Sequence, residues 1–501
     1  MRLESLKGKQ QLPDTLTKIL ILFFTLFYLL TIDNAGFWLD EVWSINDLKK
    51  PYLQMIEARA TAGHGPLYFS IAWLWLHLVG DTEWPMRLPA LLAWLGIIVF
   101  STLLIRKKIG PWGTVFTVLL LSLSPSLFYL AQLVRPYTLS ILLILINITW
   151  MLHIEDRPRL RDSLILAAIS ALAINTHAST AIPLIGQIIY LLARRKPHWN
   201  LSFAIGFGLL AILPLLLHLF EHRSWTNSPI SWLQHAVFLD LLKLPTAILL
   251  GKTSNELTLP TYWPALSILL SILTIWGGIQ SGRLGRVLLI IWGFTILVVT
   301  VITLINGPAI GTLIRYFGTI TVAQIILMNF AIFGQRKFRI AILWSTAFPL
   351  ALLLAWHLFI SLNSHRHPDW RTALAYVQEH RQGKQQLHVL ADSFEMLIYE
   401  HYYEKLQMHS QASLVKNQEI NQEVLTLDLR DITNNTKYLW IIFGEGLMNY
   451  YSHDDIRIKL LHSLQRNHSL RSQSIQLTED LTIGNITILR YRLNLAEKEP
   501  T

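Results

Sequence analysis

The sequence predicts a polytopic α-helical membrane protein, with about eleven transmembrane helices and a C-terminal α/β domain outside the cytoplasm. Two observations predict the membrane class: 52% of the 501 residues are hydrophobic and only 15% are charged. Soluble domains carry about 25% charged residues. The chain also contains no Cys. These numbers exclude a soluble enzyme, a disordered protein, a disulfide scaffold and any thiolate chemistry.

The uneven distribution of charge predicts the domain boundary. Residues 1–364 contain 27 Lys and Arg against 15 Asp and Glu, whereas residues 365–501 contain 15 against 17. Only the second part has the charge density of a soluble domain, and its sequence reads as alternating helices and strands. We therefore expect a transmembrane domain over residues 1–364 and a soluble α/β domain over residues 365–501. The net charge of +10 fits basic cytoplasmic loops better than nucleic-acid binding.

Apolar runs predict the transmembrane helices, because a helix needs about 20 residues to cross the hydrocarbon core. Eleven runs have approximately this length. They lie near residues 15–33, 87–105, 112–131, 136–152, 161–176, 178–193, 201–219, 261–280, 286–305, 310–333 and 338–361. A twelfth run, residues 66–79, has only 14 residues and is predicted to lie in the membrane interface.

Basic residues decide whether residues 66–79 count as a span. With a cytoplasmic N-terminus and eleven spans, the cytoplasmic segments hold 18 Lys and Arg, and the outer segments before residue 365 hold 9. A twelfth span would move five basic clusters to the outer side, against the positive-inside rule. We therefore expect a multi-pass protein of the plasma (inner) membrane whose C-terminal domain is extracytoplasmic.

Two predicted outer loops are long. The first covers residues 33–86, and the second covers residues 220–260, where Trp232 and Phe238 suggest an interfacial helix. Because binding and catalytic residues concentrate on loops carried by a rigid scaffold, these loops favour a site at the outer membrane surface.

Two adjacent carboxylates, Asp40 and Glu41, follow the first predicted span. Aromatic neighbours flank them, namely Phe37, Trp38 and Trp43. A solvated loop or a helix N-cap is the ordinary interpretation of such a pair. The functional interpretation is a general base in a partly apolar setting. Both interpretations stay open at this point, and in either of them the two carboxylates have different roles unless the segment is helical.

Further candidate residues lie at the outer ends of predicted spans. His64 precedes a Gly-Pro turn and is suited either to capping that turn or to contacting an anion. Arg135 and Tyr137 belong to the short loop LVRPY, and Arg315 and Tyr316 lie just inside the tenth span. A charge at mid-membrane costs roughly 2.5–3.5 kcal/mol. Arg315 therefore either extends to the outer headgroups or binds a lipid-borne phosphate.

Taken together, these motifs resemble those of the GT-C superfamily of integral-membrane glycosyltransferases. The resemblance is strongest to the family 39 type, which includes protein O-mannosyltransferases and lipid A aminoarabinose transferases. It covers residues 1–335 by motif and the last domain by position. The matching segments are Asp40-Glu41, HGPLY (64–68), MRLPA (86–90), SPSLFYLAQLVRPY (124–137) and Arg315-Tyr316.

The resemblance implies an inverting transfer of a sugar from a polyprenyl-phosphate donor to a lipid, glycan or protein acceptor. It implies that Asp40 is the base for the acceptor hydroxyl and that Glu41 supports it. It further implies a substrate-binding set around the leaving phosphate. That set consists of His64, Arg135, Tyr137, Arg315 and Tyr316.

The sequence departs from some members of this family in its second outer loop. Those members carry a further acidic residue there, whereas residues 133–137 of this chain contain none. A divalent metal ion would have only Asp40, Glu41 and water as ligands, which is weak support for Mg²⁺ or Mn²⁺. We therefore predict metal-independent transfer with no cofactor.

Two other functions stay open as alternatives. One is a transporter or flippase of lipid-linked glycans, which would carry charged residues in several mid-spans. The other is a polymerase or ligase of lipid-linked glycans, which would place its site in a large loop late in the bundle. The early acidic pair favours the transferase.

Overall fold

The computed structural model divides into two compact units. The helical unit comprises Met1–Ile32 and Asp47–Ile360, and the sheet unit comprises Asp33–Asn46 and Ser361–Thr501. The predicted boundary at residue 364 rests on charge density and stays a prediction. The structure describes residues 2–221, 242–251, 263–306, 314–334, 346–363, 369–380, 386–390, 393–405, 412–414, 438–443, 473–483 and 486–495.

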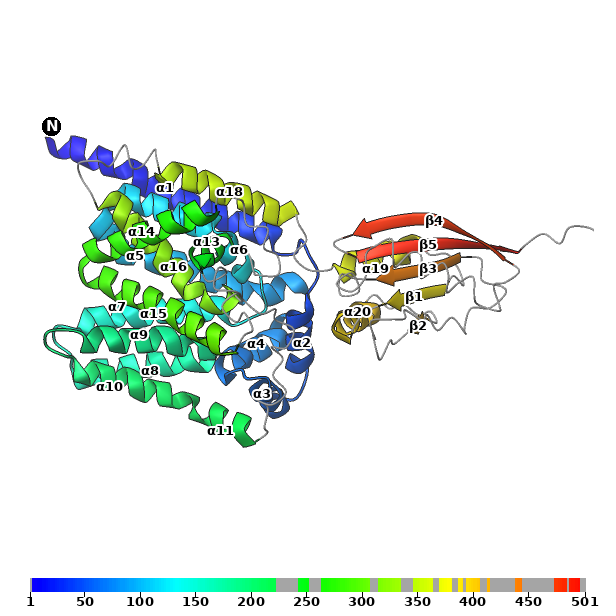
Figure 1. Ribbon diagram of the computed structural model, residues 1–501, viewed down its shortest axis with the longest axis horizontal. Helices are drawn as coiled ribbons and strands as arrows, with labels where there is room; N and C mark the ends of the chain where they lie inside the picture. Colours follow the sequence, from blue (N-terminus) through cyan, green and yellow to red (C-terminus); the bar gives the residue numbers. More distant parts are fainter. Residues whose placement is uncertain are drawn as a thin grey trace, which may run out of the picture. The chain divides into compact units, whose positions relative to one another are not determined.

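The described part of the helical unit is built almost entirely from helices (Figure 1). Six described helices are long and apolar enough to cross a membrane, and shorter apolar helices accompany them. The helices are α1 (Arg2–Thr31), α3 (Tyr52–Thr61), α4 (Pro66–Val79), α5 (Glu83–Leu123), α6 (Pro125–Ala131), α7 (Tyr137–Ile154), α8 (Leu160–Thr176), α9 (Ala181–Leu192), α10 (Trp199–Leu209), α11 (Leu213–Glu221), α13 (Leu244–Leu250), α14 (Trp263–Gln280), α15 (Gly282–Asn306), α16 (Gly318–Phe333) and α18 (Phe348–Asn363). The short 3₁₀ turns are η1 (Ala178–Thr180), η2 (Leu210–Ile212) and η5 (Ile314–Phe317).

Each predicted apolar run coincides with helix over its described residues. The predicted spans 87–105 and 112–131 share α5, which is broken at Gly110 with φ +73° directly before Pro111. The second of them ends early at Leu123 and resumes as α6. Pro125 at the first turn of α6 enforces this second break, because it cannot donate an intrahelical hydrogen bond. Trp232 and Phe238, predicted on an interfacial helix, lie outside the described residues.

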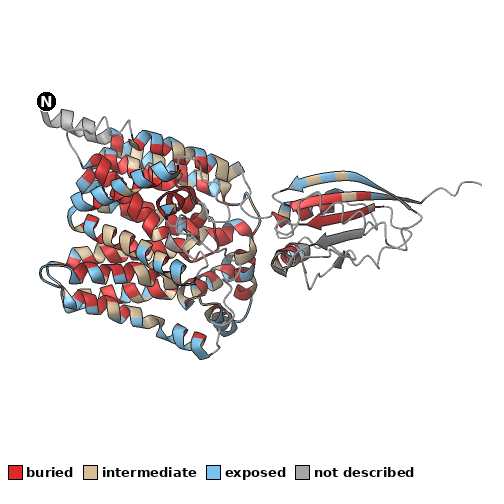
Figure 2. Ribbon diagram, in the orientation of Figure 1, coloured by how far each residue is buried: buried red, intermediate tan, exposed pale blue. Residues whose placement is uncertain are grey.

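Small residues let the helices of this unit pack closely, as is usual between membrane helices. A Cβ atom on Gly277 of α14 would clash with the Leu327 carbonyl oxygen of α16. A Cβ atom on Gly208 of α10 would come within 2.5 Å of the Ala167 carbonyl oxygen of α8. Figure 2 shows that the buried residues lie on the faces where the helices pack against one another.

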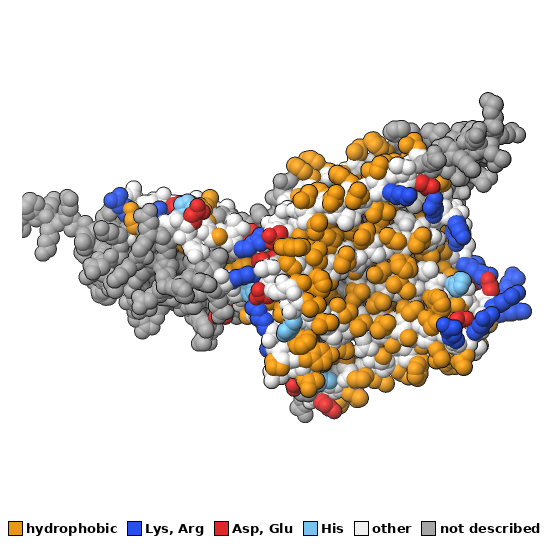
Figure 3. Space-filling model, turned by 180° about the vertical axis from the view of Figure 1, so that it is seen from behind, with side chains coloured by type: hydrophobic (Ala, Val, Ile, Leu, Met, Phe, Trp, Pro, Cys, Tyr) orange, Lys and Arg blue, Asp and Glu red, His pale blue; other side chains and the backbone are white. Residues whose placement is uncertain are grey.

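The outward surface of the helical unit is apolar over a wide area (Figure 3). Exposed side chains include Leu30, Leu103, Phe207 and Leu304, each more than half exposed. Soluble monomers rarely expose contiguous apolar patches of more than a few hundred Å². The apolar surface and the six long apolar helices identify a multi-pass membrane protein.

The sheet unit contains a five-stranded mixed sheet of order β2-β1-β3-β5-β4. The central strand β3 is apolar, and its residues after Tyr438 are buried. Strand β1 pairs in parallel with β2 and β3, whereas β5 pairs antiparallel with β3 and β4. The strands are β1 (Gln386–Leu390), β2 (Ala412–Leu414), β3 (Tyr438–Phe443), β4 (Gln473–Ile483) and β5 (Ile486–Leu495), and the helices are α19 (Trp370–His380) and α20 (Ser393–Lys405). The predicted α/β class of this part is confirmed.

One predicted strand of this unit is wrong in its extent. The segment TIGNITILRYRL, residues 482–493, reads as a single strand, but the structure has the two antiparallel strands β4 and β5. Ile483 pairs with Ile486 across two residues, Gly484 and Asn485 in the sequence. Such a dipeptide between two apolar runs is a β-hairpin signal. The segment DDIRIKLLHSLQ, residues 454–465, reads as a helix in the sequence and lies outside the described residues.

Candidate functional site

A tight turn between α3 and α4 positions His64 in the helical unit. Gly63 adopts φ +80°, and the His64 amide donates to the Arg59 carbonyl at 2.9 Å. A Cβ atom on Gly65 would clash with the Asn175 carbonyl oxygen at the end of α8. Glycine at position 65 therefore allows the His64 turn to lie directly against the α8 terminus.

Arg135 lies in the turn between α6 and α7 and is only 5% exposed. Its amide donates to the Leu133 carbonyl at 2.8 Å, which folds the loop back toward the bundle. The Arg135 Nη2 atom lies 3.3 Å from Nε2 of His64. Because a guanidinium group can only donate, Nε2 of His64 accepts this bond, and the neutral ring carries its proton on Nδ1.

His177 follows α8 and joins the same region. The Ser179 amide donates to His177 Nδ1 at 3.2 Å, so the neutral ring carries its proton on Nε2. The centre of this ring lies 6.3 Å from the His64 ring and 5.4 Å from the Tyr137 ring at the start of α7. His177 also stacks on Tyr316, with ring centres 5.4 Å apart.

The 3₁₀ turn η5 contributes the last two members of this group. The Arg315 guanidinium lies 5.6 Å from the centre of the Tyr316 ring, and that ring lies 6.0 Å from the Tyr137 ring. Four segments far apart in the sequence thus meet at one place. We call this group the basic cluster, and its members are His64, Arg135, Tyr137, His177, Arg315 and Tyr316.

The basic cluster keeps both of its histidines neutral. Burial, together with the charges of Arg135 and Arg315, lowers the pKa of His177 to about 3. Burial lowers the pKa of His64 well below its usual value, and the nearby Arg135, His177, Arg59 and Arg315 lower it further. These arginines therefore impose a positive potential that opposes further protonation. An anion at the cluster would reverse this effect.

Arg59 of α3 contributes to this potential from a neutralised position. It is 2% exposed and forms an ion pair with Asp47, which also binds Lys50 at 2.6 Å. Its guanidinium lies 5.3 Å from the centre of the Phe69 ring. Arg59 is therefore held in place by its own counter-ion, Asp47. The charges that lower the pKa of His177 are those of Arg135 and Arg315.

The hydroxyl of Tyr137 is a further buried polar group of the basic cluster. Tyr137 is 1% exposed, and its hydroxyl has no hydrogen-bond partner among the described residues. Buried polar atoms are usually paired, so such an atom points to a ligand or an ordered water.

Asp40 and Glu41 lie in the sheet unit, in the first turn of α2 (Leu39–Leu48). The Trp38 carbonyl accepts the amides of Glu41 and Val42 at 2.9 Å each, and the Trp38 amide donates to Glu41 Oε2 at 3.3 Å. This is the capping-box arrangement, in which the third helical residue bonds back to the N-cap amide. Glu41 is buried and Asp40 is partly exposed. The ordinary interpretation of the acidic pair, a carboxylate that stabilises a helix N-terminus, therefore applies to Glu41.

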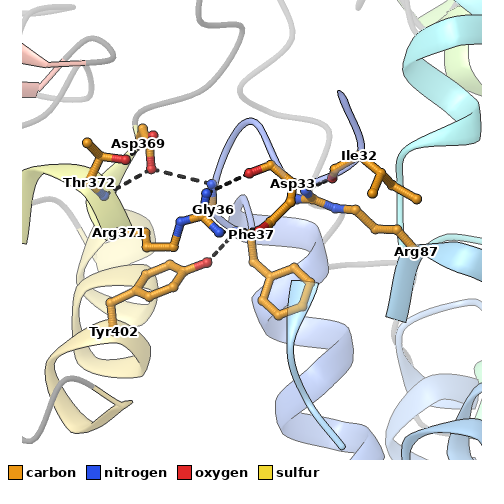
Figure 4. Close-up of polar contacts among 9 residues, drawn as sticks. All are labelled: Ile32, Asp33, Gly36, Phe37, Arg87, Asp369, Arg371, Thr372 and Tyr402. Atoms are coloured by element: carbon orange, nitrogen blue, oxygen red, sulfur yellow. Dashed lines mark hydrogen bonds and ion pairs between the residues drawn. The ribbon is translucent and has the colours of Figure 1, made fainter. Parts of the chain in front are cut away.

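Arg87 of the MRLPA segment has a structural contact within the helical unit. It donates to the Ile32 carbonyl at 2.8 Å, at the end of α1 (Figure 4). This bond fixes the point at which the chain leaves the first predicted span.

The structure thus brings together all five residues predicted to bind substrate, and the sequence interpretation missed His177 and Arg59. His177 lies in the segment NTHAS, residues 175–179, so a histidine between two predicted spans was its available signal. Arg59 had none. The catalytic roles of Asp40 and Glu41 stay predictions. The described residues hold no group of three His, Asp or Glu side chains suited to a metal ion, and metal independence also stays a prediction.

Comparison with known proteins matches residues 63–225 to the family described as dolichyl-phosphate-mannose-protein mannosyltransferase. This range contains four members of the basic cluster but neither Asp40 nor Arg315. Comparison with curated proteins gives no match.

Three solved structures are similar to this chain at low identity. ArnT from Cupriavidus metallidurans in the apo state has 13% identity and a TM-score of 0.42, over 99% of this chain and 100% of that one. The same protein bound to undecaprenyl phosphate has 13% identity and a TM-score of 0.39, over 96% and 98%. The Archaeoglobus fulgidus oligosaccharyltransferase tethered to an acceptor peptide has 12% identity and a TM-score of 0.41, over 67% and 54%. The family match over residues 63–225 bears out the predicted resemblance to protein O-mannosyltransferases in this part of the chain.

Proposed function

We propose that the chain is an inverting glycosyltransferase that moves a sugar from a polyprenyl-phosphate donor to a lipid, glycan or protein acceptor at the outer membrane face. The observation that carries this proposal is the basic cluster. It unites four segments, lies largely within residues 63–225, and leaves a buried Tyr137 hydroxyl without a partner among the described residues. The name of the matched family specifies a sugar on a polyprenyl-type phosphate.

The basic cluster fits the phosphate of such a donor. Arg135 and Arg315 supply positive charge, while the Tyr137 hydroxyl and His177 Nε2–H are hydrogen-bond donors. A phosphodiester carries one negative charge, and the phosphate gains a second when the glycosidic bond breaks. Cations and donors held in advance where this charge develops lower the barrier, because they need no reorganisation during the reaction.

Asp40 is the proposed general base. Its carboxylate takes the proton of the acceptor hydroxyl, the acceptor oxygen bonds to the anomeric carbon, and the electron pair of the broken bond leaves with the phosphate. A single displacement of this kind inverts the anomeric carbon. Glu41 supports Asp40 indirectly, because it caps the helix on which Asp40 stands.

The membrane setting follows from the donor. The prenyl chain lies against the apolar helices while its phosphate reaches the basic cluster at the outer surface. The N-terminus is cytoplasmic, the C-terminal domain is extracytoplasmic, and the membrane is the plasma (inner) membrane, in agreement with the basic loops. The proposed transfer needs no metal ion.

A deletion strain provides the test. Without the enzyme, its donor should accumulate, and mass spectrometry of the lipids identifies the polyprenyl-phosphate sugar. In the transfer assay, the purified protein is added to membranes of this strain, and the initial rate of donor loss is measured. Asp40→Asn should lower this rate by about 10²–10⁴-fold while binding of undecaprenyl phosphate is retained.

Consumption of the donor separates this function from that of a flippase, and an arginine variant serves as the negative control. A flippase would move the lipid without breaking the glycosidic bond, so the donor would not be consumed. Arg106→Ala removes an exposed arginine that pairs with Asp14 at 2.6 Å and should leave the rate unchanged. Full activity of Asp40→Asn would show that the base is assigned wrongly.

A further inference from the structure

The loop that precedes Asp40 is held by the helices of the sheet unit (Figure 4). Residues Asp33–Asn46 are grouped with residues 361–501 rather than with the helices that flank them in sequence. Three side chains more than 330 positions further along the chain contact this loop. They are Asp369, Arg371 and Tyr402.

Arg371 of α19 binds the beginning of the loop with both of its terminal nitrogens. Its Nη1 contacts Asp33 Oδ1 at 2.7 Å, and its Nη2 donates to the Asp33 carbonyl at 2.7 Å. A planar guanidinium that uses two donors fixes direction as well as distance. Arg371 thus binds both the side chain and the backbone of Asp33.

Asp369 and Tyr402 bind the two amides that follow. The Asp369 carboxylate caps α19, since it accepts the Thr372 amide at 3.2 Å, and it also accepts the Gly36 amide at 3.4 Å. The Tyr402 hydroxyl accepts the Phe37 amide. Because these bonds are made to backbone atoms, they fix the path of the loop independently of its side chains.

The Phe37 side chain completes this contact. Phe37 is 1% exposed and lies 5.8 Å from the His401 ring and 5.7 Å from the Lys405 ammonium group. Gly36 is equally confined. A Cβ atom there would lie 2.8 Å from the Tyr402 hydroxyl oxygen and 2.9 Å from Arg371 Cβ. The loop therefore fits against α19 and α20 only with glycine at position 36.

We propose that Asp369, Arg371 and Tyr402 are positioning residues for Asp40, so that the sheet unit fixes the general base in its working position. Phe37, the last residue bound, is followed by Trp38, the N-cap of α2, and Asp40 is the second residue of that helix. Fixing Phe37 therefore fixes the beginning of α2. This inference rests on the proposed function, in which Asp40 is the base.

The proposal predicts a loss of rate without a loss of donor affinity. A base must be held close to its reacting geometry, and small misplacements cost rate rather than binding. The residues proposed to bind phosphate are other residues, in the helical unit. Release of the loop should therefore lower kcat and leave the affinity for undecaprenyl phosphate unchanged.

Tyr402→Phe is the primary test, because it removes the hydroxyl and keeps the ring. We expect kcat in the transfer assay to fall about tenfold, with unchanged affinity for undecaprenyl phosphate. The matched control is Tyr376→Phe, since the Tyr376 hydroxyl bonds Glu479 within the same unit and not the loop. This control should keep the wild-type kcat.

The rates must be expressed per correctly folded molecule, because partial unfolding also lowers a measured rate. The stoichiometry of undecaprenyl phosphate binding gives the number of folded molecules. Hydrogen exchange of the amides over residues 36–41 adds a structural readout. Exchange should accelerate in Tyr402→Phe and not in Tyr376→Phe.

Variants of Arg371 and Gly36 keep the inference testable if Tyr402→Phe folds poorly. Arg371→Lys retains the charge but loses the fork, so its kcat should lie between those of the wild type and Arg371→Gln. Gly36→Ala should resemble Tyr402→Phe, because the added methyl group separates the loop from α20.

The outcomes distinguish this inference from the function on which it rests. An inactive Asp40→Asn together with wild-type kcat for Tyr402→Phe and Arg371→Gln would overturn the positioning role alone. An active Asp40→Asn would overturn the assignment of the base itself. A change in undecaprenyl phosphate affinity in Tyr402→Phe, with unchanged kcat, would also contradict the proposal.

Discussion

The basic cluster and the Asp40 loop are built in opposite ways. In the cluster, arginines and neutral histidines gather around a buried tyrosine hydroxyl, and the local potential is positive. In the loop, backbone amides and carboxylates are matched to partners, and Glu41 caps its own helix. The comparison teaches that the proposed phosphate site concentrates positive charge, whereas the proposed base stands on a helix whose preceding loop is fixed by backbone hydrogen bonds.

The two neighbouring carboxylates give the largest expected contrast. Asp40→Asn removes the proposed base and should lower the transfer rate by about 10²–10⁴-fold. Glu41→Gln keeps an acceptor for the Trp38 amide, because glutamine also serves at this capping position. The transfer assay should therefore show a much smaller loss, less than about tenfold. Equal losses for the two variants would mean that Glu41 takes part in the chemistry.

The arginines of the helical unit give the next contrast. Arg135→Ala and Arg315→Ala should each weaken binding of undecaprenyl phosphate roughly 10- to 100-fold, the effect of losing a charged hydrogen bond. Equilibrium binding to protein in detergent measures this. If Arg315→Ala binds undecaprenyl phosphate with unchanged affinity, Arg315 interacts with the outer headgroups instead of the donor phosphate.

Donor binding should also depend on pH through His177. Burial and the two arginines lower the pKa of His177 to about 3, and a bound anion should raise it, so binding should take up protons as pH falls from about 6 towards 3. Affinity for a polyprenyl phosphomannose should then increase on acidification, because this phosphodiester keeps one charge over that range. His177→Gln should flatten the profile. A wild-type affinity that stays constant over that range would contradict the role.

Protonation of His177 should lower the stability of the protein without donor. The folded pKa of this histidine lies below the unfolded value of about 6.5, so the unfolded chain binds more protons below that pH. Stability should fall as pH decreases from about 6.5 towards 3, and donor should oppose this loss. Thermal unfolding with and without undecaprenyl phosphate, in wild type and His177→Gln, measures both effects.

The smallest expected effect is that of metal removal. The transfer rate should be unchanged after treatment with EDTA. Loss of activity in EDTA, restored by Mn²⁺, would show that Asp40 and Glu41 take part in a metal site after all.

The sequence predicted the helices well, because length and apolarity alone determine them. It singled out Arg135 and Arg315 of the basic cluster as charges that the positive-inside rule left unexplained, and the family motifs supplied His64, Tyr137 and Tyr316. It missed His177, since a single histidine in a short loop carries no pattern. It could not place Asp369, Arg371 or Tyr402, because their contacts join residues more than 330 positions apart. The hairpin of β4 and β5 was missed although its Gly-Asn signal was present.

The grouping of Asp33–Asn46 with residues 361–501 has a practical consequence for chimeric proteins. Grafting the C-terminal domain of a relative at residue 360 alone would pair a foreign α19 and α20 with the native loop. Exchange of this unit between relatives should therefore require three junctions, near residues 32, 46 and 360. The two pieces that must be exchanged together are separated in the sequence by residues 47–360 of the helical unit.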